Sequence, residues 1–135
     1  MVVRKKLLNT FLAISISSLP VFAHAGIYSP DLNIINNTDN FSTSIINNGA
    51  CSTILGDIGI SKPNSKSTIP GSKVRLACIL NTSNCSADVY MTNNCTGNKI
   101  ATVTFDVNQG VKLVKMDTTA YLITGVGFDV YLNKV

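Results

Sequence analysis

The stretch that most constrains this chain is residues 77–97, ACILNTSNCSADVYMTNNCTG, which holds three of the four cysteines and two asparagine-rich turns. Between the turns, apolar residues alternate with polar or aromatic ones from Cys85 to Thr92. That period of two is typical of a β-strand with one face toward a core. The stretch therefore predicts an extended segment bounded by cysteines.

The four cysteines predict two disulfides, because an even number in a small exported chain favours a disulfide framework. If residues 86–92 extend at about 3.3 Å per residue, Cys85 lies roughly 20 Å or more from Thr92, and Cys95 is three residues farther on. A disulfide needs Cα atoms within about 7 Å, so Cys85–Cys95 would require a break in that strand. Cys78 and Cys85 flank a short loop and can meet across its mouth, which leaves Cys51 for Cys95. We therefore predict Cys78–Cys85 and Cys51–Cys95. A four-cysteine zinc site is the alternative, but the chain lacks a C-x-x-C pair.

Residues 1–25 have the organisation of a secretory signal peptide. Positive charges at residues 4–6 precede an apolar stretch over 7–22, and Ala23-His24-Ala25 places small residues at a cleavage site. A transmembrane anchor is the alternative, but polar residues and Pro20 interrupt the apolar stretch. We expect a signal peptide over 1–25, one domain over 26–135, and no integral membrane span after cleavage.

Removal of the signal peptide changes the charge of the chain. The formal net charge of +4 includes the cations at residues 4–6, so the remainder has eight lysine and arginine residues against seven aspartates. A net charge of +1 without runs of basic residues does not favour a nucleic-acid partner. About 110 residues are enough for one domain with one core.

Short segments rich in β-branched and aromatic residues, separated by Asn, Gly and Pro, predict an all-β protein. The spacing predicts about seven to nine short strands in an antiparallel β-sandwich, with an open β-barrel as the alternative. Segments 73–80 and 85–92 are expected to form a hairpin, and 56–72 is the longest irregular stretch. Residues 121–132 form either one kinked strand or a tight hairpin. The expected strands are 32–36, 41–46, 51–55, 58–61, 73–80, 85–92, 99–107, 111–116 and 121–132.

The composition of the mature chain argues against catalysis. It has no histidine and no glutamate, which excludes Ser-His and Cys-His nucleophile systems and His-based general acids. The seven aspartates are scattered, and Asp117-Thr118-Thr119 matches the aspartic-protease Asp-Thr-Gly motif only in part. We therefore expect no enzymatic activity, no cofactor and no metal.

Three tyrosines are candidates for a binding surface, namely Tyr90, Tyr121 and Tyr131. Exposed tyrosines can stack on sugars or anchor a protein interface. The alternative is that each covers the edge of its own core. Five N-x-S/T sequons are expected to mark exposed turns rather than glycans: those beginning at Asn36, Asn40, Asn81, Asn84 and Asn94.

The segment CSADVYMTNNCTG, with the Asn-, Lys- and Ile-rich composition and the signal peptide, resembles small exported proteins of Legionella-type intracellular bacteria over about residues 33–111. The resemblance implies a periplasmic or type II-secreted protein and carries over no functional residue. We expect a non-catalytic secreted or periplasmic protein that binds a host or envelope partner, an unknown protein or glycan, through its surface. A carbohydrate-binding module and a fimbrial-type subunit are the alternatives. A fimbrial subunit would lack a strand, whereas this chain has enough to close its own sheets.

Overall fold

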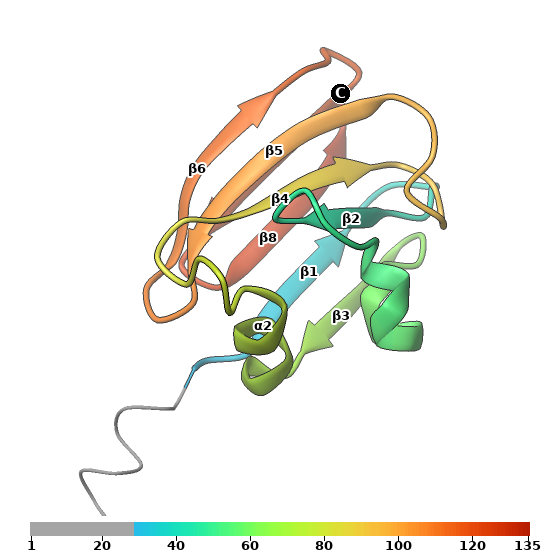
Figure 1. Ribbon diagram of the computed structural model, residues 1–135. Coiled ribbons are helices and arrows are strands. Elements are labelled where there is room, and N and C mark those ends of the chain that lie inside the picture. The colour runs from blue at the N-terminus through green and yellow to red at the C-terminus, as the bar shows by residue number, and fades with distance from the viewer. Residues whose placement is uncertain (1–28) are drawn as a thin grey trace, which may run out of the picture.

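Eight strands in two four-stranded sheets form the framework of residues 29–135, the part of the chain that the computed structural model describes (Figure 1). The predicted all-β sandwich is confirmed, and the two sheets do not join into a barrel. The predicted signal peptide lies outside the described residues. The elements are β1 (Leu32–Asn36), β2 (Thr43–Ile46), the 3₁₀ helix η1 (Ser52–Gly59), β3 (Ser65–Ile69), α2 (Gly71–Ala77), β4 (Cys85–Tyr90), β5 (Lys99–Asp106), β6 (Gly110–Met116), β7 (Tyr121–Val126) and β8 (Asp129–Lys134).

One sheet has the strand order β3-β1-β8-β7 and the other β2-β4-β5-β6. All pairings are antiparallel except that of β1 with β8, which is parallel and joins the two ends of the domain. At the β6 and β7 edges the sheets approach closely, since the Val111 amide donates to the Gly127 carbonyl at 2.8 Å. Gly110, with φ of 100°, is required there because a Cβ would lie 2.2 Å from the Gly127 oxygen.

At the opposite side of the sandwich, the edge strands β2 and β3 do not pair with each other. Two isolated bridges, Ser42 to Ser61 and Ile45 to Cys51, place the segment containing η1 against the free edge of β2. Such a cover protects the unpaired groups of an edge strand. The helix α2 lies at this side as well (Figure 1).

The core consists of two clusters of buried side chains. The first holds Val89, Ile100, Ala101, Val103, Ile123, Val130 and Leu132, and the second Ile69, Val74, Cys78, Cys85, Phe105 and Val107. Leu32 and Ile34 of β1 pack against both. The alternation predicted for β5 is confirmed, because Ala101, Val103 and Phe105 are buried and the threonines between them are partly exposed.

The predicted strand over 73–80 is wrong. Residues 71–77 form the helix α2 instead, so β4 pairs with β2 and β5 rather than with residues 73–80. Pro70, with φ of −55°, precedes the helix, and its carbonyl accepts hydrogen bonds from the amides of Lys73 and Val74 at 2.9 and 3.1 Å. Gly71 is needed because a Cβ there would lie 1.8 Å from the Ser29 carbonyl oxygen.

The predicted strand over 51–55 is also wrong, because η1 occupies Ser52–Gly59. The Ser52 hydroxyl donates to the Gly59 carbonyl at 2.6 Å and accepts from the Ser44 amide at 3.0 Å, which folds the segment onto β2. The expected strand over 58–61 reduces to one bridge at Ser61. Strand β3 lies within the stretch predicted to be irregular, so that prediction is wrong for residues 65–69.

Of the two alternatives for the C-terminal segment, the structure has the hairpin. Residues 121–132 form a hairpin, with Val126 opposite Asp129 in the last pair of the β7–β8 ladder. Asn47 and Asn48 have φ values of 50° and 57°, as a tight turn through Asn-Asn-Gly requires.

Candidate functional site

Two disulfides fix the loops at the end of the sandwich where α2 lies and beside η1. Cys78, after the last turn of α2, bonds Cys85 at the start of β4, with 5.5 Å between the Cα atoms. Cys51 bonds Cys95, with 6.0 Å between the Cα atoms. This is the predicted pairing. The prediction of the Cys78–Cys85 bond is correct although the predicted hairpin is wrong, because the bond requires only a short loop between the two cysteines.

The disulfide-closed segment after α2 exposes three large apolar side chains, which we call the α2 tip: Leu76, Ile79 and Leu80. Their exposed fractions are 66%, 65% and 93%. On the other side of the helix, Val74 and Cys78 are buried in the second core cluster. Exposed apolar side chains gathered on one loop are typical of an interaction site.

Three cations surround the α2 tip. Lys73 and Arg75 project from α2 itself, and Lys112 of β6 reaches the loop, where its Nζ donates to Asn84 Oδ1 at 2.7 Å. Arg75 donates to Ser29 Oγ at 2.9 Å and to Asn108 Oδ1 at 2.7 Å, both neutral oxygens. Within residues 29–135, none of these three cations forms an ion pair with a carboxylate.

Two carboxylates near this end of the molecule accept hydrogen bonds from backbone amides. Asp31 Oδ1 accepts from the Gly71 amide at 2.8 Å, and Asp106 Oδ1 accepts from the Asn108 amide at 2.7 Å. The tip thus combines an apolar centre with cations that form no ion pair within residues 29–135 and can contact an anionic partner.

The sequence did not predict the α2 tip, because the predicted strand over 73–80 contains Leu76, Ile79 and Leu80. A signal existed in the charges: residues 58–87 contain four cations and no carboxylate. A second signal was the apolar pair Ile79-Leu80, which lies directly before an asparagine-containing turn.

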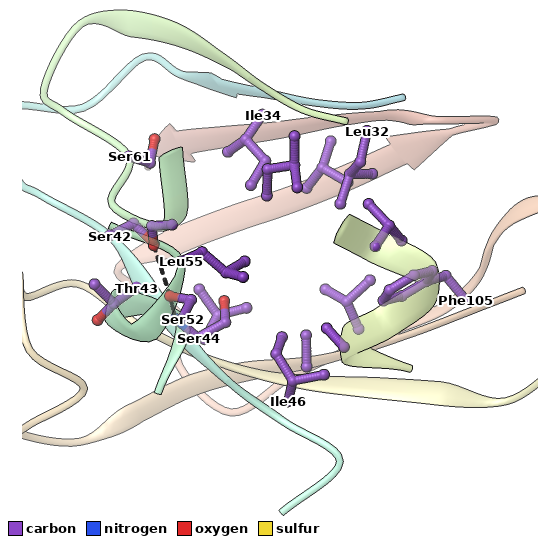
Figure 2. Close-up of a pocket in the computed structure, with 18 of the residues that line it drawn as sticks. Leu32, Ile34, Ser42, Thr43, Ser44, Ile46, Ser52, Leu55, Ser61 and Phe105 are labelled. Atoms are coloured by element: carbon purple, nitrogen blue, oxygen red, sulfur yellow. Dashed lines mark hydrogen bonds between the residues drawn. The ribbon is translucent and has the colours of Figure 1, made fainter. Parts of the chain in front are cut away.

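Behind α2 lies a cavity of about 90 Å³ between the two sheets. Figure 2 shows Leu55 of η1 pointing into it, with Ile34 and Leu32 above, Ile46 below and Phe105 beside α2. Residues of both core clusters line the cavity. Ser61 lies in its wall, beside η1 and on the far side from α2 (Figure 2).

The three candidate tyrosines lie in different places. Tyr90 is in β4, facing away from the buried Val89, whereas Tyr121 and Tyr131 belong to the other sheet. All three are half-buried, and Tyr121 packs against the first core cluster. The structure does not bring them together as one surface, and a binding role for each stays a prediction.

Among the aspartates, Asp88 and Asp117 lie on either side of Lys99, with Nζ–O distances of 4.0 and 3.7 Å. Thr102 Oγ1 also donates to Asp88 at 2.8 Å, so these groups link β4, β5 and the turn after β6. Residues 29–135 hold no group of three or more potential metal ligands. In the same residues, no helix has the length and apolar character to cross a bilayer.

The fold and the two disulfides define a small disulfide-bonded β-sandwich of the kind that forms in an oxidising, extracytoplasmic compartment. More particularly, the chain belongs to the family of the type II secretion system substrate NttC, whose sequence model matches residues 4–135. It is therefore an exported protein, and the resemblance to exported proteins of Legionella-type bacteria is confirmed.

A solved structure with a similar fold is the crystal structure of the Legionella pneumophila type II secretion system substrate NttC. The two sequences are 23% identical, with a TM-score of 0.64, and the match covers 80% of this chain and 100% of that one. No curated protein matches the sequence.

Proposed function

We propose that this is a non-catalytic secreted protein that attaches to a host or envelope surface through the α2 tip, and that this surface is an anionic lipid bilayer. The observation that carries the proposal is the exposure of Leu76, Ile79 and Leu80 among unpaired cations. Interfacial membrane binding combines these two elements, because apolar side chains enter the acyl boundary while cations contact anionic headgroups.

The geometry of α2 suits such attachment. Val74 and Cys78 anchor the helix in the core, and the Cys78–Cys85 bond holds the loop in place. Ile79 and Leu80 therefore stay exposed without the entropy cost of ordering a loose loop on binding. The cations Lys73, Arg75 and Lys112 lie on the elements around them.

We expect the purified protein to co-sediment with vesicles containing phosphatidylglycerol or phosphatidylserine and to bind phosphatidylcholine vesicles at least several-fold less. The double variant Ile79→Ser/Leu80→Ser should weaken binding to anionic vesicles at least about tenfold, because it removes the apolar surface that enters the bilayer. Lys73→Gln should weaken it roughly fivefold, since a lysine near an anionic surface contributes about 1 kcal/mol.

The matched control is Leu122→Ser/Val126→Ser, which changes two exposed apolar residues of β7, at the other edge of the sheet from β3. It should bind anionic vesicles like the unchanged protein, and circular dichroism should show all variants folded. Equal binding to neutral and anionic vesicles, or an equal loss in the control, would contradict the proposal. If the protein attached to cells but not to vesicles, the partner would be a protein or glycan and not the lipid bilayer.

A further inference from the structure

The cavity behind α2 is a second feature, of which the proposed attachment uses only Lys73. Its walls come from both sheets, with η1 and α2 at its two ends (Figure 2). No strand pairing joins β2 to β3 at this side, where the segment containing η1 lies against the edge of β2. Side chains that would otherwise complete the core, among them Leu32, Ile34 and Leu55, are only partly buried here.

The chemistry of the lining is that of a site for a hydrocarbon chain. Among residues 29–135, fifteen of the 22 residues that line the cavity carry apolar side chains, and none carries a carboxylate. Lys73 is the one charged residue of the lining, and it is exposed, whereas the rest of the lining is buried or half-buried. An apolar interior with a single cation at its rim fits a molecule with an apolar chain and one negative end.

Two of the five hydroxyl groups in the described lining form hydrogen bonds within the protein. Thr43 Oγ1 donates to the Thr92 carbonyl at 2.8 Å, and Ser52 Oγ donates to the Gly59 carbonyl at 2.6 Å. Ser61 is 4% exposed, and its Oγ is buried and has no hydrogen-bond partner among the described residues. Buried hydroxyls nearly always have a partner, so the protein's own atoms do not complete this wall.

We propose that this cavity binds the acyl chain of a single-chain carboxylate amphiphile, with the carboxylate paired to Lys73. A volume of about 90 Å³ leaves room for roughly six to nine water-sized groups, since each needs about 10–15 Å³ of such space. A medium-length chain of the octanoate type fits this size. The site shares Lys73 with the proposed vesicle attachment, but none of the apolar residues of the α2 tip lines the cavity.

The test is isothermal titration calorimetry of the disulfide-intact protein with straight-chain carboxylates from butanoate to dodecanoate. Affinity should rise roughly fourfold for each added methylene and then level off once the chain fills the cavity. Lys73→Gln should weaken octanoate binding several-fold and leave the binding of neutral 1-octanol unchanged. The matched control, Lys66→Gln on β3, removes a cation that does not line the cavity and should change neither.

Two further measurements locate the ligand and its source. Octanoate should shift the methyl NMR signals of Ile34 and Leu55 and leave those of Ile79 and Leu80 in place, and Ala77→Leu, which fills the cavity from α2, should abolish binding. Displacement of octanoate by dihexanoyl phosphatidylcholine below its micelle concentration would identify lipid acyl chains as the source, and its absence would identify free acids. The proposal is wrong if octanoate shows no saturable binding at millimolar concentration, or if the shifted methyls are those of the tip.

Discussion

Replacement of both Cys51 and Cys95 by serine is expected to lower the free energy of unfolding by about 4 kcal/mol, against about 2.5 kcal/mol for the Cys78→Ser/Cys85→Ser pair. The difference follows from loop length. The Cys51–Cys95 bond has a sequence separation of 44 and the Cys78–Cys85 bond one of 7. In the chain-entropy model, closing the longer loop removes more freedom from the unfolded chain.

The position of Cys95 adds a native-state contribution in the same direction. Cys95 has a positive φ of 55°, and its amide donates to Thr43 Oγ1 at 2.8 Å. The disulfide holds this strained residue beside β2 and the segment that begins η1. Its loss should therefore also loosen the cover over the edge of β2.

Urea unfolding of the two double-serine variants measures the effect, and non-reducing peptide mapping confirms which bond each variant retains. For a domain of this size the larger loss corresponds to a melting temperature lower by roughly 15 °C or more. Equal losses in the two variants, or a larger loss for the short loop, would show that loop length does not determine the contribution.

The disulfide pairing could be predicted because the exclusion of a Cys85–Cys95 bond rested on the segment with the clearest strand pattern. Alternation from Cys85 onward required an extended strand, and β4 is extended, which separates Cys85 from Cys95. The conformation of the segment before Cys85 was not needed for that step. The framework was therefore correct although the predicted hairpin was not.

The helix α2 could not be distinguished from a strand by periodicity, because Val74 and Cys78 are four residues apart. That spacing places two residues on one face of a strand and also on one face of a helix. The structure separates the two alternatives at Leu76, which would face the core in a strand and is exposed in α2. Seven residues are too few for the helical period to emerge, and Pro70 was the local sign of a helix start.

Strand β3 was missed for a different reason. Its sequence, Ser-Lys-Ser-Thr-Ile, has the alternation of an edge strand but small polar residues where apolar ones are expected. Its place is fixed by pairing with β1, from Leu32 opposite Ile69 to Asn36 opposite Ser65. Cross-strand pairing between distant segments cannot be read from the local pattern, and the α2 tip and the cavity depend on it.

One of the five sequons also shows that the environment of a residue cannot be predicted from the local sequence alone. Asn40, Asn81, Asn84 and Asn94 are exposed, as the turn reading predicts, but Asn36 is completely buried. Its side chain serves the turn between β1 and β2. Nδ2 donates to the Asn40 carbonyl at 2.8 Å, and Oδ1 accepts from the Thr38 amide at 3.0 Å and the Thr38 hydroxyl at 2.7 Å.

Asn36→Ala is therefore expected to destabilise the protein by about 3 kcal/mol. Thr38 is itself buried, so its amide would lose its partner without gaining water, and a buried unsatisfied group costs about 1–3 kcal/mol. The small cavity left by the side chain adds to this loss. The neighbouring variant Asn37→Ala is the matched control, because Asn37 is exposed and its one side-chain hydrogen bond, to Asn133 Oδ1 at 3.0 Å, is also exposed.

Chemical denaturation should show a loss of less than about 1 kcal/mol for the control, several-fold smaller than for Asn36→Ala. Hydrogen exchange provides the local readout, since the Thr38 amide should lose its protection in Asn36→Ala and keep it in Asn37→Ala. Equal destabilisation by the two variants would mean that the turn depends on asparagine composition in general. A selective effect at Asn36 would mean that one buried amide side chain directs the chain from β1 to β2, and so from one sheet of the sandwich to the other.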